Sequence, residues 1–389
     1  MRIGIFMIGS REWMGGVSYV ENLVKAVRLL PMHEQPRLFL ISGEANLAAL
    51  EQHTRFLHLF DGFCYCGRRC NEVSQLVSVP CYPFSGYAEL FSHIDFCFLG
   101  ADAELDGYPS AAWIPDFQFL HLPELFSDEE CQVRTAWIRD RARHTSLIVL
   151  SSRDAEQDFG RLVPDATTQT RILHFHTLPD DGLLQGDPNK VQQKYGMPDR
   201  FLLCCNQFWM HKDHATLFRA LALLREVGMV VHLACTGSTD DYRNRGYFDE
   251  LQQLIHELKI TDQVQILGHI PRSDQMQLMR RSLCMVQPSL FEGWSTVVED
   301  ARALGKTLVL SDIAVHREQE PDYAAYFEKS NAFALAAQLN KLLPLMQPGP
   351  HMVRETVAIS ESLQLAKGFG RCFCSIAREV LQYRTDIMI

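Results

Sequence analysis

The chain carries a carboxylate, a glycine and two hydroxyl side chains at a spacing that suits a sugar joined to a phosphate. Glu292 and Gly293 follow an apolar run at 283–286, and Ser295 and Thr296 precede a helical pattern. The free N–H groups and the positive dipole end of such a helix bind a diphosphate well. A carboxylate beside them is better suited to accepting hydrogen bonds from sugar hydroxyls. The segment therefore predicts a nucleotide-sugar site.

A second carboxylate extends this site. Asp300 comes eight residues after Glu292, which places it about two turns into the predicted helix. The helical pattern ends near Gly305, a residue type common just after helices. Asp300 is therefore expected to reach a second hydroxylated group of the same ligand.

Composition limits what kind of protein could hold this site. The chain has 389 residues, which favours two domains, and its net charge of -10 argues against a nucleic-acid binder. No apolar run is long enough to span a membrane. Twelve cysteines, with a strand pattern beginning at Met1 in place of a secretory leader, indicate free thiols in a reducing compartment.

The elements that must position these residues alternate between strand and helix. In the first half, strands are predicted at 2–8, 37–42, 94–99, 112–114, 147–150 and 172–175, and helices at 17–29 and 129–143. In the second half, strands are predicted at 201–205, 230–235, 264–267, 283–286 and 307–310, and helices at 215–226, 247–258, 273–282 and 297–304. This alternation predicts an α/β fold with two Rossmann-like, doubly wound domains facing each other across a cleft, and ligands bound beyond the carboxyl ends of the strands.

Turn-forming residues mark the boundary between the two domains. They concentrate at 176–199, where a linker is expected. The predicted domains are 1–180 and 181–365, and the second carries the segment with Glu292 and Asp300. A long helix is predicted near 363–383. It forms most of the predicted final segment, 366–389, which is expected to pack back on the first domain.

One stretch of the sequence resembles a known family. Residues 288–306 (PSLFEGWSTVVEDARALGK), followed by 311–318 (SDIAVHRE), resemble the donor-site segment of family 4 retaining glycosyltransferases, which have the GT-B fold. The similarity continues at 206–214 (NQFWMHKDH) and 266–271 (ILGHIP). In the first half it includes Gly15 and Gly16, 113–118 (WIPDFQ) and 122–124 (LPE).

The resemblance implies roles on the donor side. Glu292 matches the first acid of the family motif, which contacts the donor sugar, and Asp300 matches the second, which holds the ribose and is usually the longer Glu. Lys212 matches the phosphate-binding lysine, and Gln207 stands where the family usually has an arginine. The implied donor-binding set is Gly15, Gly16, Gln207, Lys212, Gly268, Ile270, Glu292, Gly293, Trp294, Ser295, Thr296, Val297 and Asp300.

The acceptor side is expected at Asp116, Gln118 and His121. Phe119 occupies the position at which related sequences often have a histidine, and His121 follows two residues later. The implied catalytic residues are Glu292, Lys212 and His121. The implied reaction is front-face transfer with retention, in which the departing phosphate takes the acceptor proton and neither a metal nor another cofactor takes part.

Plain structural interpretations stand beside these roles. Glu292 could be a solvated loop carboxylate, Asp300 an exposed helix residue, Lys212 a surface lysine and His121 an ordinary, partly buried histidine. Gly15 and Gly16 could form a structural turn, and His316 and Arg317 could be a surface pair. A cysteine group could bind zinc or consist of free thiols: Cys64, Cys66, Cys70 and Cys81. An arginine group could face lipid or solvent: Arg134, Arg139, Arg141 and Arg143.

The expected function is transfer of a sugar from a nucleoside-diphosphate sugar to a glycan or lipid-linked saccharide, as in polysaccharide or lipopolysaccharide biosynthesis. The expected location is the cytoplasm, with a peripheral contact at the inner face of the cytoplasmic membrane left open. The alternatives are a nucleotide-sugar epimerase of the same fold and a non-catalytic nucleotide-sugar-binding scaffold protein. A phosphorylase would require a pyridoxal-lysine context, which the sequence does not show.

Overall fold

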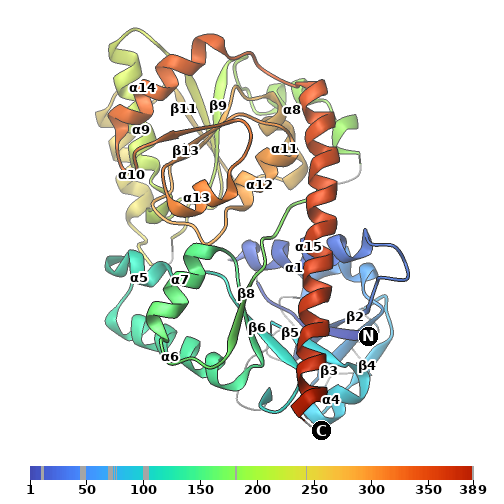
Figure 1. Cartoon of the computed structure of the whole chain (residues 1–389). Helices are drawn as coiled ribbons and strands as arrows, with labels where there is room; N and C mark the ends of the chain where they lie inside the picture. The colour runs from blue at the N-terminus through green and yellow to red at the C-terminus, as the bar shows by residue number, and fades with distance from the viewer. Residues whose placement is uncertain are drawn as a thin grey trace. The chain divides into compact units, whose positions relative to one another are not determined.

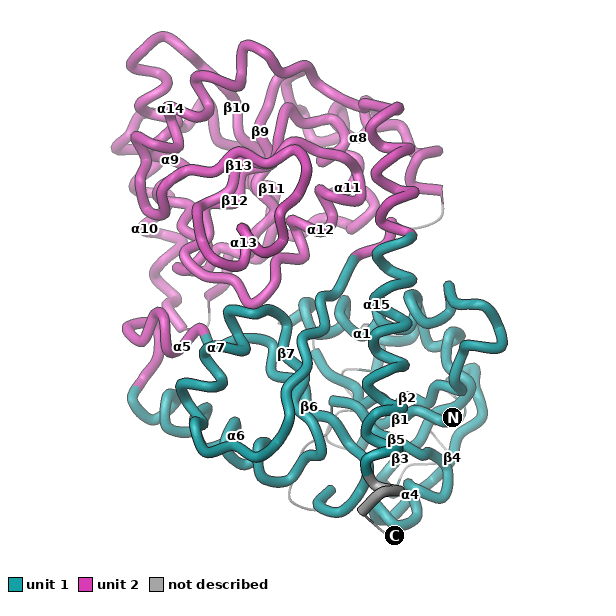
Figure 2. The backbone as a smooth tube through the Cα atoms, in the orientation of Figure 1, with its two compact units in different colours: residues 1–117, 128–176, 364–389 teal, residues 118–127, 177–363 magenta. Residues whose placement is uncertain are grey.

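The chain forms two compact units, each built on a parallel sheet (Figure 2). The computed structural model describes residues 1–9, 13–43, 50–68, 73, 75, 77–99, 105–179, 182–241 and 243–387. Unit 1 comprises Met1–Phe117, Asp128–His176 and Gln364–Ile389, and unit 2 comprises Gln118–Ser127 and Thr177–Leu363.

The described residues of unit 1 form an eight-stranded sheet in the order β4-β3-β2-β1-β5-β6-β7-β8 (Figure 1). Its strands are β1 (Arg2–Phe6), β2 (Arg37–Gly43), β3 (Gly62–Cys66), β4 (Cys81–Pro83), β5 (Phe96–Phe98), β6 (Ser110–Ile114), β7 (Leu147–Leu150) and β8 (Gln169–Ile172). Its helices are α1 (Met14–Arg28), α2 (Leu50–His53), η2 (Thr54–Leu59), α4 (Tyr87–His93), α6 (Asp128–His144) and α7 (Arg153–Leu162).

The described residues of unit 2 form a six-stranded sheet in the order β11-β10-β9-β12-β13-β14. Its strands are β9 (Phe201–Cys205), β10 (His232–Thr236), β11 (Val264–Gly268), β12 (Met285–Gln287), β13 (Leu308–Ser311) and β14 (Ala324–Phe327). Its helices are α5 (Gln118–His121), η4 (Pro123–Leu125), η5 (Leu183–Gln185), α8 (Pro188–Lys194), η6 (Met210–Lys212), α9 (His214–Glu226), α10 (Tyr247–Glu257), α11 (Arg272–Arg281), α12 (Thr296–Ala303), α13 (Ala314–Gln319), α14 (Ala332–Leu342) and η7 (Leu343–Leu345).

Strand β9 shows why this sheet must be covered on both faces. Leu202 and Cys204 enter a core with residues of α9, α10 and α14, whereas Phe201, Leu203 and Cys205 enter another core with residues of α11 and α12. Successive side chains of a strand point to opposite faces, so an unbroken apolar run requires helices on both sides. The predicted doubly wound α/β fold is confirmed.

The strand order of unit 2 also locates a ligand-binding edge. Strand β9 has β10 on one side and β12 on the other, so the connections that leave these strands diverge there. Ligands of open α/β sheets bind beyond the carboxyl ends of strands at such a switch point. The loops after β9 and β12 carry Lys212 and Glu292.

The last helix, α15 (Met352–Ile387), contributes to both units (Figure 2). Within unit 2, Glu355 pairs with the buried Arg280 at 3.0 Å. Within unit 1, the Phe373 ring lies 4.9 Å from the Phe98 ring. The helix begins eleven residues before the predicted start at 363, because its first turns pack in unit 2.

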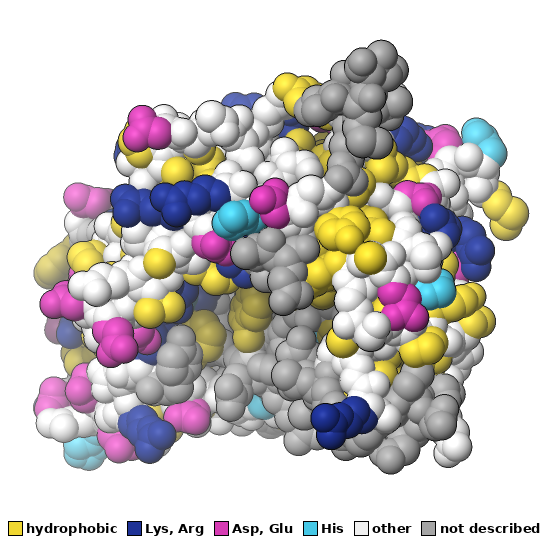
Figure 3. Space-filling view, turned by 90° about the horizontal axis from the view of Figure 1, so that it is seen from below, with side chains coloured by type: hydrophobic (Ala, Val, Ile, Leu, Met, Phe, Trp, Pro, Cys, Tyr) yellow, Lys and Arg dark blue, Asp and Glu magenta, His cyan; other side chains and the backbone are white. Residues whose placement is uncertain are grey.

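Helix α6 carries the arginines that the sequence left open to two interpretations. Arg141 stacks over the Trp137 ring at 3.7 Å, and the first turn of the helix is acidic. On the face shown in Figure 3, described basic, acidic and apolar side chains are interspersed. Among the described helices, none is both long and apolar enough to cross a membrane.

Candidate donor-sugar site

Glu292 and Lys212 form a short ion pair in unit 2. Lys212 Nζ lies 2.6 Å from Glu292 Oε1, and the two side chains are only 15% and 8% exposed. Burial by itself raises the pKa of Glu292, but the charge of Lys212, supported by His316, brings that pKa below its ordinary value. Glu292 is therefore a buried, ionised carboxylate, and the interpretations as a solvated loop carboxylate and a surface lysine are wrong for these two residues.

A hydrogen-bond network joins the loop after β9 to the loop after β12. Gln287 donates to the same Glu292 Oε1 at 2.9 Å, and it exchanges two amide hydrogen bonds with Asn206 at the end of β9. Leu290 N–H donates to the His211 carbonyl oxygen at 2.7 Å. Because each loop is fixed to the other, the Lys212–Glu292 geometry follows from the packing of β9 beside β12.

The first turn of α12 supplies the N–H groups expected to face a diphosphate. Gln319 holds its start by accepting from Ser295 N–H at 3.2 Å and donating to Ser295 O at 3.0 Å. Glu299 N–H makes the first backbone bond of the helix, to Ser295 O. The N–H groups of Thr296 and Val297 precede that bond and have no acceptor within the helix. With the positive end of the dipole they are suited to an anion next to Glu292.

Asp300 is buried and bound by an arginine. Its carboxylate is 2% exposed and receives both terminal nitrogens of Arg272, Nη1 at 2.6 Å and Nη2 in a second, shorter contact. The interpretation of Asp300 as an exposed helix residue is therefore wrong, and it lies in the second turn of α12 (Thr296–Ala303). A hydroxylated group arriving here would meet a carboxylate already paired with a guanidinium.

His316 also lies inside unit 2, although a surface pair with Arg317 was one of the alternatives that the sequence left open. Its side chain is fully buried on α13, and Nδ1 lies 2.8 Å from the carbonyl oxygen of Ser311. Burial lowers the pKa of His316 although the nearby Glu292 charge acts to raise it. Arg317, the next residue, is exposed and pairs with Asp312 at 2.6 Å. The surface-pair interpretation is wrong for His316.

The remaining donor-side candidates of unit 2 lie in or next to the loops that follow β9, β11 and β12. Gly268 ends β11 with φ of 66°, a left-handed conformation that favours glycine, and its carbonyl accepts from Gly237 N–H. Ile270 and Trp294 are both 9% exposed, and Ile270 packs in the core with α11 and α12. Gln207 and Gly293 are half-buried in the loops that carry Lys212 and Glu292.

The glycine pair of unit 1 lies at the start of α1. A Cβ on Gly16 would lie 2.9 Å from the Trp13 ring and 3.1 Å from Gly9 Cα, and one on Gly15 would lie 3.2 Å from Trp13 Nε1. Close packing within unit 1 therefore favours glycine at position 16. Asp116 is half-buried after β6.

The acceptor-side candidates that follow Asp116 belong to unit 2. The exposed His121 ends α5, and its ring lies 4.9 Å from the Phe291 ring, next in sequence to Glu292. Gln118 Oε1 accepts from Arg243 Nη1 at 3.1 Å. Phe119, at the position where the family often has a histidine, is 4% exposed and belongs to the core.

The described cysteines of the 64–81 group lie on two neighbouring strands, β3 and β4. Cys64 is buried on β3, Cys66 and Cys81 are half-buried, and Cys70 lies outside the described residues. Burial, with a contribution from Cys81, raises the pKa of Cys64 to about 12.

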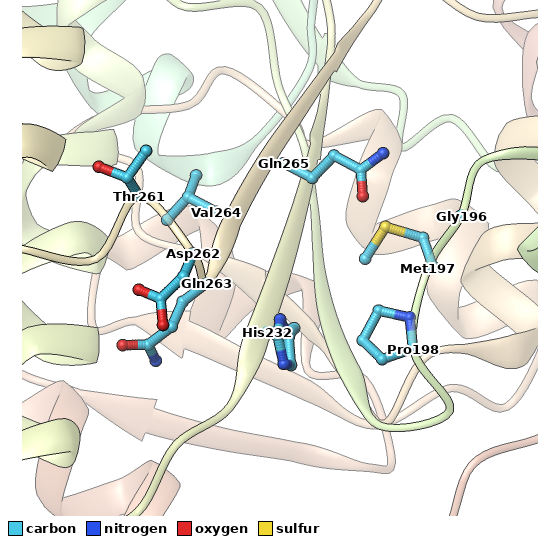
Figure 4. Close-up of a pocket in the computed structure, with 9 residues that line it drawn as sticks. All are labelled: Gly196, Met197, Pro198, His232, Thr261, Asp262, Gln263, Val264 and Gln265. Carbon is cyan, nitrogen blue, oxygen red and sulfur yellow. The ribbon is translucent and has the colours of Figure 1, made fainter.

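A separate hollow of about 460 Å³ opens in unit 2 (Figure 4). It lies at the amino ends of β10 and β11, whereas Lys212 and Glu292 follow the carboxyl ends of β9 and β12. Its lining residues are Gly196, Met197, Pro198, His232, Thr261, Asp262, Gln263, Val264 and Gln265.

Sequence reasoning missed three side chains that define the site. The sequence pattern assigns no role to Gln287 or Arg272, and it leaves His316 open to interpretation as a surface residue. Two of their contacts join segments far apart in the sequence: Arg272 lies 28 residues from Asp300, and Gln287 lies 81 residues from Asn206. The one available signal was position, since Arg272 and Gln287 both lie at or just beyond strand ends.

Comparisons with known proteins agree with this architecture. Residues 187–352 match the family model "Glycosyl transferases group 1". The structure of HepE (Alr3699) from Anabaena, solved in complex with UDP-glucose, has a TM-score of 0.63 at 17% identity, with 99% of this chain and 100% of that chain covered. Sucrose-phosphate synthase from Thermosynechococcus elongatus has a TM-score of 0.60 at 13% identity, with 100% and 99% covered.

A third solved structure, a glycosyltransferase from Rickettsia africae, has a TM-score of 0.56 at 13% identity, with 99% of this chain and 97% of that chain covered. None of the curated proteins compared matches the chain. At these identities the structural likeness shows the fold, and the family model adds a match within the second half. The chain has the GT-B fold, and the match across residues 187–352 supports a glycosyltransferase.

Proposed function

We propose that this chain is a retaining glycosyltransferase that moves a sugar from a nucleoside-diphosphate sugar to a glycan or lipid-linked saccharide. The observation that carries the proposal is the buried Lys212–Glu292 pair placed beside the first turn of α12. A cation and helix N–H groups suit a diphosphate, and a buried carboxylate suits sugar hydroxyls. The HepE structure in complex with UDP-glucose gives further support, because it shares this fold.

The chemistry of transfer explains these residue types. When the anomeric C–O bond breaks, its electron pair goes to the phosphate oxygen and positive charge develops on the sugar ring. Lys212 and the N–H groups of Thr296 and Val297 stabilise the negative charge on the leaving diphosphate, and Glu292 orients the sugar. Preorganised groups need little rearrangement during the reaction, which is why the tight hydrogen bonding around Gln287 matters.

The proposed stereochemistry follows from where the acceptor proton goes. The acceptor hydroxyl attacks from the face that the diphosphate is leaving, and its proton passes to the departing phosphate oxygen. The new bond therefore forms on the same face, and the anomeric configuration is retained. In this proposal Lys212 and α12 neutralise the diphosphate without a metal ion, and Asp300 with Arg272 lies on the nucleoside side.

The acceptor and the location are further parts of the proposal. Asp116, Gln118 and His121 are assigned to the acceptor side, and His121 has its ring against Phe291. A saccharide acceptor made in the cytoplasm, some of it linked to lipid, would bring the protein to the inner membrane face. Co-sedimentation with vesicles containing anionic lipid, with and without the α6 variant Arg134→Glu/Arg139→Glu, tests this contact.

The test of the proposed function is turnover of a defined donor panel. Purified protein is incubated with UDP-, GDP-, ADP- and dTDP-sugars and with saccharide and lipid extracts, and release of nucleoside diphosphate is measured. We expect acceptor-dependent release in EDTA, a product with the donor's anomeric configuration, and loss of turnover in Glu292→Gln. Inactivity of the wild type across all donors and acceptors would overturn the proposal.

The same assay separates the two alternatives. An epimerase would convert the donor sugar without any acceptor. A non-catalytic scaffold would bind a donor, detected as thermal stabilisation, without consuming it. Two replacements favour the scaffold: Gln207 in place of the usual arginine, and the core residue Phe119 in place of the usual histidine.

A further inference from the structure

One buried nitrogen near the proposed site lacks a hydrogen-bond partner. Nε2 of His316 is inaccessible to solvent, and no described residue supplies it with a donor or an acceptor. The ring is fully buried on α13, directly after β13. Buried polar atoms are nearly always hydrogen-bonded, so such an orphan calls for a missing partner.

The other ring nitrogen determines what that partner must be. Nδ1 lies 2.8 Å from the carbonyl oxygen of Ser311, which can only accept, so Nδ1 carries the proton. Ser311 is itself fixed, because its hydroxyl donates to Ser289 O at 2.6 Å. In the neutral ring Nε2 is then an acceptor. The missing partner is a hydrogen-bond donor, such as a hydroxyl group.

The ring also lies in the electrostatic field of the donor-site ion pair. The pKa of His316 is lowered first by burial, and Glu292, Lys212 and Asp312 act on it through their charges. Conversely, His316 acts on the pKa of Glu292. Hydrogen bonds connect the two residues: Ser311 donates to Ser289 O, and Gln287 donates both to Ser289 Oγ at 3.2 Å and to Glu292 Oε1 at 2.9 Å.

We propose that His316 Nε2 accepts a hydrogen bond from a hydroxyl of the donor sugar, which makes His316 a specificity-determining residue. The inference rests on the proposed function and deepens it, because Glu292 and His316 then present two acceptors to one sugar. This arrangement selects a neutral sugar with free hydroxyls on the edge that faces them. It disfavours a sugar that is deoxygenated at the hydroxyl facing Nε2, or one that carries a carboxylate there.

The experiment compares binding of a nucleotide sugar with binding of its nucleoside diphosphate. Binding is measured by calorimetry with UDP-glucose and with UDP. If the wild type binds another nucleotide sugar of the donor panel, that sugar and the matching nucleoside diphosphate are used instead. The variants are His316→Asn, which keeps a donor towards Ser311 but removes Nε2, and His316→Gln, whose longer amide reaches towards the Nε2 position. Arg317→Ala, an exposed neighbour on the same helix, is the matched control.

We expect His316→Asn to weaken nucleotide-sugar binding about tenfold while diphosphate binding changes less than about twofold. His316→Gln should recover part of the loss, and Arg317→Ala should change neither. Donors lacking one hydroxyl at a time complete the test. Removing the hydroxyl that faces Nε2 should weaken binding to wild type about tenfold and leave His316→Asn unaffected.

Two results would overturn the inference. The first is that His316→Asn weakens binding of the diphosphate as much as binding of the nucleotide sugar. The second is that every deoxy donor loses the same affinity for the wild type as for His316→Asn. A wild type that binds no donor would instead overturn the proposed function. The tautomer is tested without any donor by nitrogen-15 NMR of His316, where a proton on Nε2 at neutral pH would contradict the assignment.

Discussion

The Lys212–Glu292 pair is the residue-scale feature on which the proposed site depends. Its two members come from different loops and are only 15% and 8% exposed. Removing one partner of a buried pair leaves an uncompensated charge, which costs more than removing both. The same pair that would bind a donor is therefore also a stability determinant.

This asymmetry gives the first prediction. Lys212→Ala should lower the free energy of unfolding by about 3 kcal/mol, because the ionised Glu292 stays buried without its partner. The double variant Lys212→Ala/Glu292→Gln should lose less. Urea denaturation of wild type, both single variants and the double variant forms the cycle that measures the coupling. Additive losses in the double variant would contradict a direct interaction.

The Arg272–Asp300 pair gives a second residue-scale prediction. Asp300 is 2% exposed but Arg272 is 40% exposed, so solvent screens one end of the pair. We expect Arg272→Ala to cost about 1–2 kcal/mol, because Asp300 loses both terminal guanidinium nitrogens. Arg317→Ala, whose partner Asp312 is also exposed, should cost less than about 1 kcal/mol. Equal losses in the two variants would show that the burial of Asp300 has no energetic effect.

At the scale of elements, local patterns predicted strands and helices well where the chain is strongly periodic. The predicted strand 201–205 is β9, and the predicted helix 215–226 is α9 with one more residue. The strand predicted at 172–175 is β8, which the structure places at Gln169–Ile172. The prediction followed the apolar residues, whereas this edge strand is short and partly polar.

The expected linker at 176–199 shows why turn formers can mislead. Asp187 and Pro188 suggested a loop, but Asp187 caps α8 by accepting from Asn189 N–H at 2.9 Å, and Pro188 is its first residue. Proline is well tolerated at that position because its missing N–H would be unpaired anyway. Likewise Glu292 could be placed near a helix start from local pattern, whereas its contacts with Lys212 and Gln287 depend on how strands pair.

Helix α9 provides an element-scale prediction that bears on Lys212. Asp213 follows Lys212, has φ of 49° and caps α9 by accepting from Thr216 N–H at 3.2 Å. Asp213→Ala should lower the free energy of unfolding by about 1–2 kcal/mol, because it loses the cap and keeps an unfavourable left-handed conformation. Asp213→Gly should lose less, since glycine accepts that conformation without strain.

Thermal unfolding of both variants, with donor binding measured in parallel, checks this prediction. If α9 sets the position of the Lys212 loop, Asp213→Ala should also weaken diphosphate binding, and Asp213→Gly should do so less. A larger stability loss for glycine than for alanine would mean that the backbone conformation at Asp213 is not the controlling factor.

At the scale of the whole molecule, similarity in structure extends much further than similarity in sequence. The family model matches residues 187–352, whereas the HepE structure covers 99% of the chain at 17% identity. Many apolar sequences of suitable volume and periodicity can fill the same layered cores. The matched residues 187–352 include Lys212, Glu292 and Asp300.

Stability against pH gives the last prediction, because two buried histidines act in the same direction. Burial lowers the pKa of both His211 and His316. These side chains therefore bind protons less readily in the folded chain than in the unfolded chain, where histidine titrates at about pH 6.5. Their contribution to stability is complete above pH 6.5 and is lost as the pH falls below it. Glu292, whose pKa is also lowered, loses its contribution only at more acidic pH.

We therefore expect the free energy of unfolding to fall by about 1–2 kcal/mol between pH 7 and pH 5.5, before the carboxylates are protonated. His316→Asn should remove part of this fall, since it has no imidazole to protonate in either state. Chemical denaturation at a series of pH values measures the slope, with His256→Asn at an exposed position of α10 as the control for loss of an imidazole as such. An unchanged slope in His316→Asn would show that this ring is protonated as readily in the folded chain as in the unfolded one.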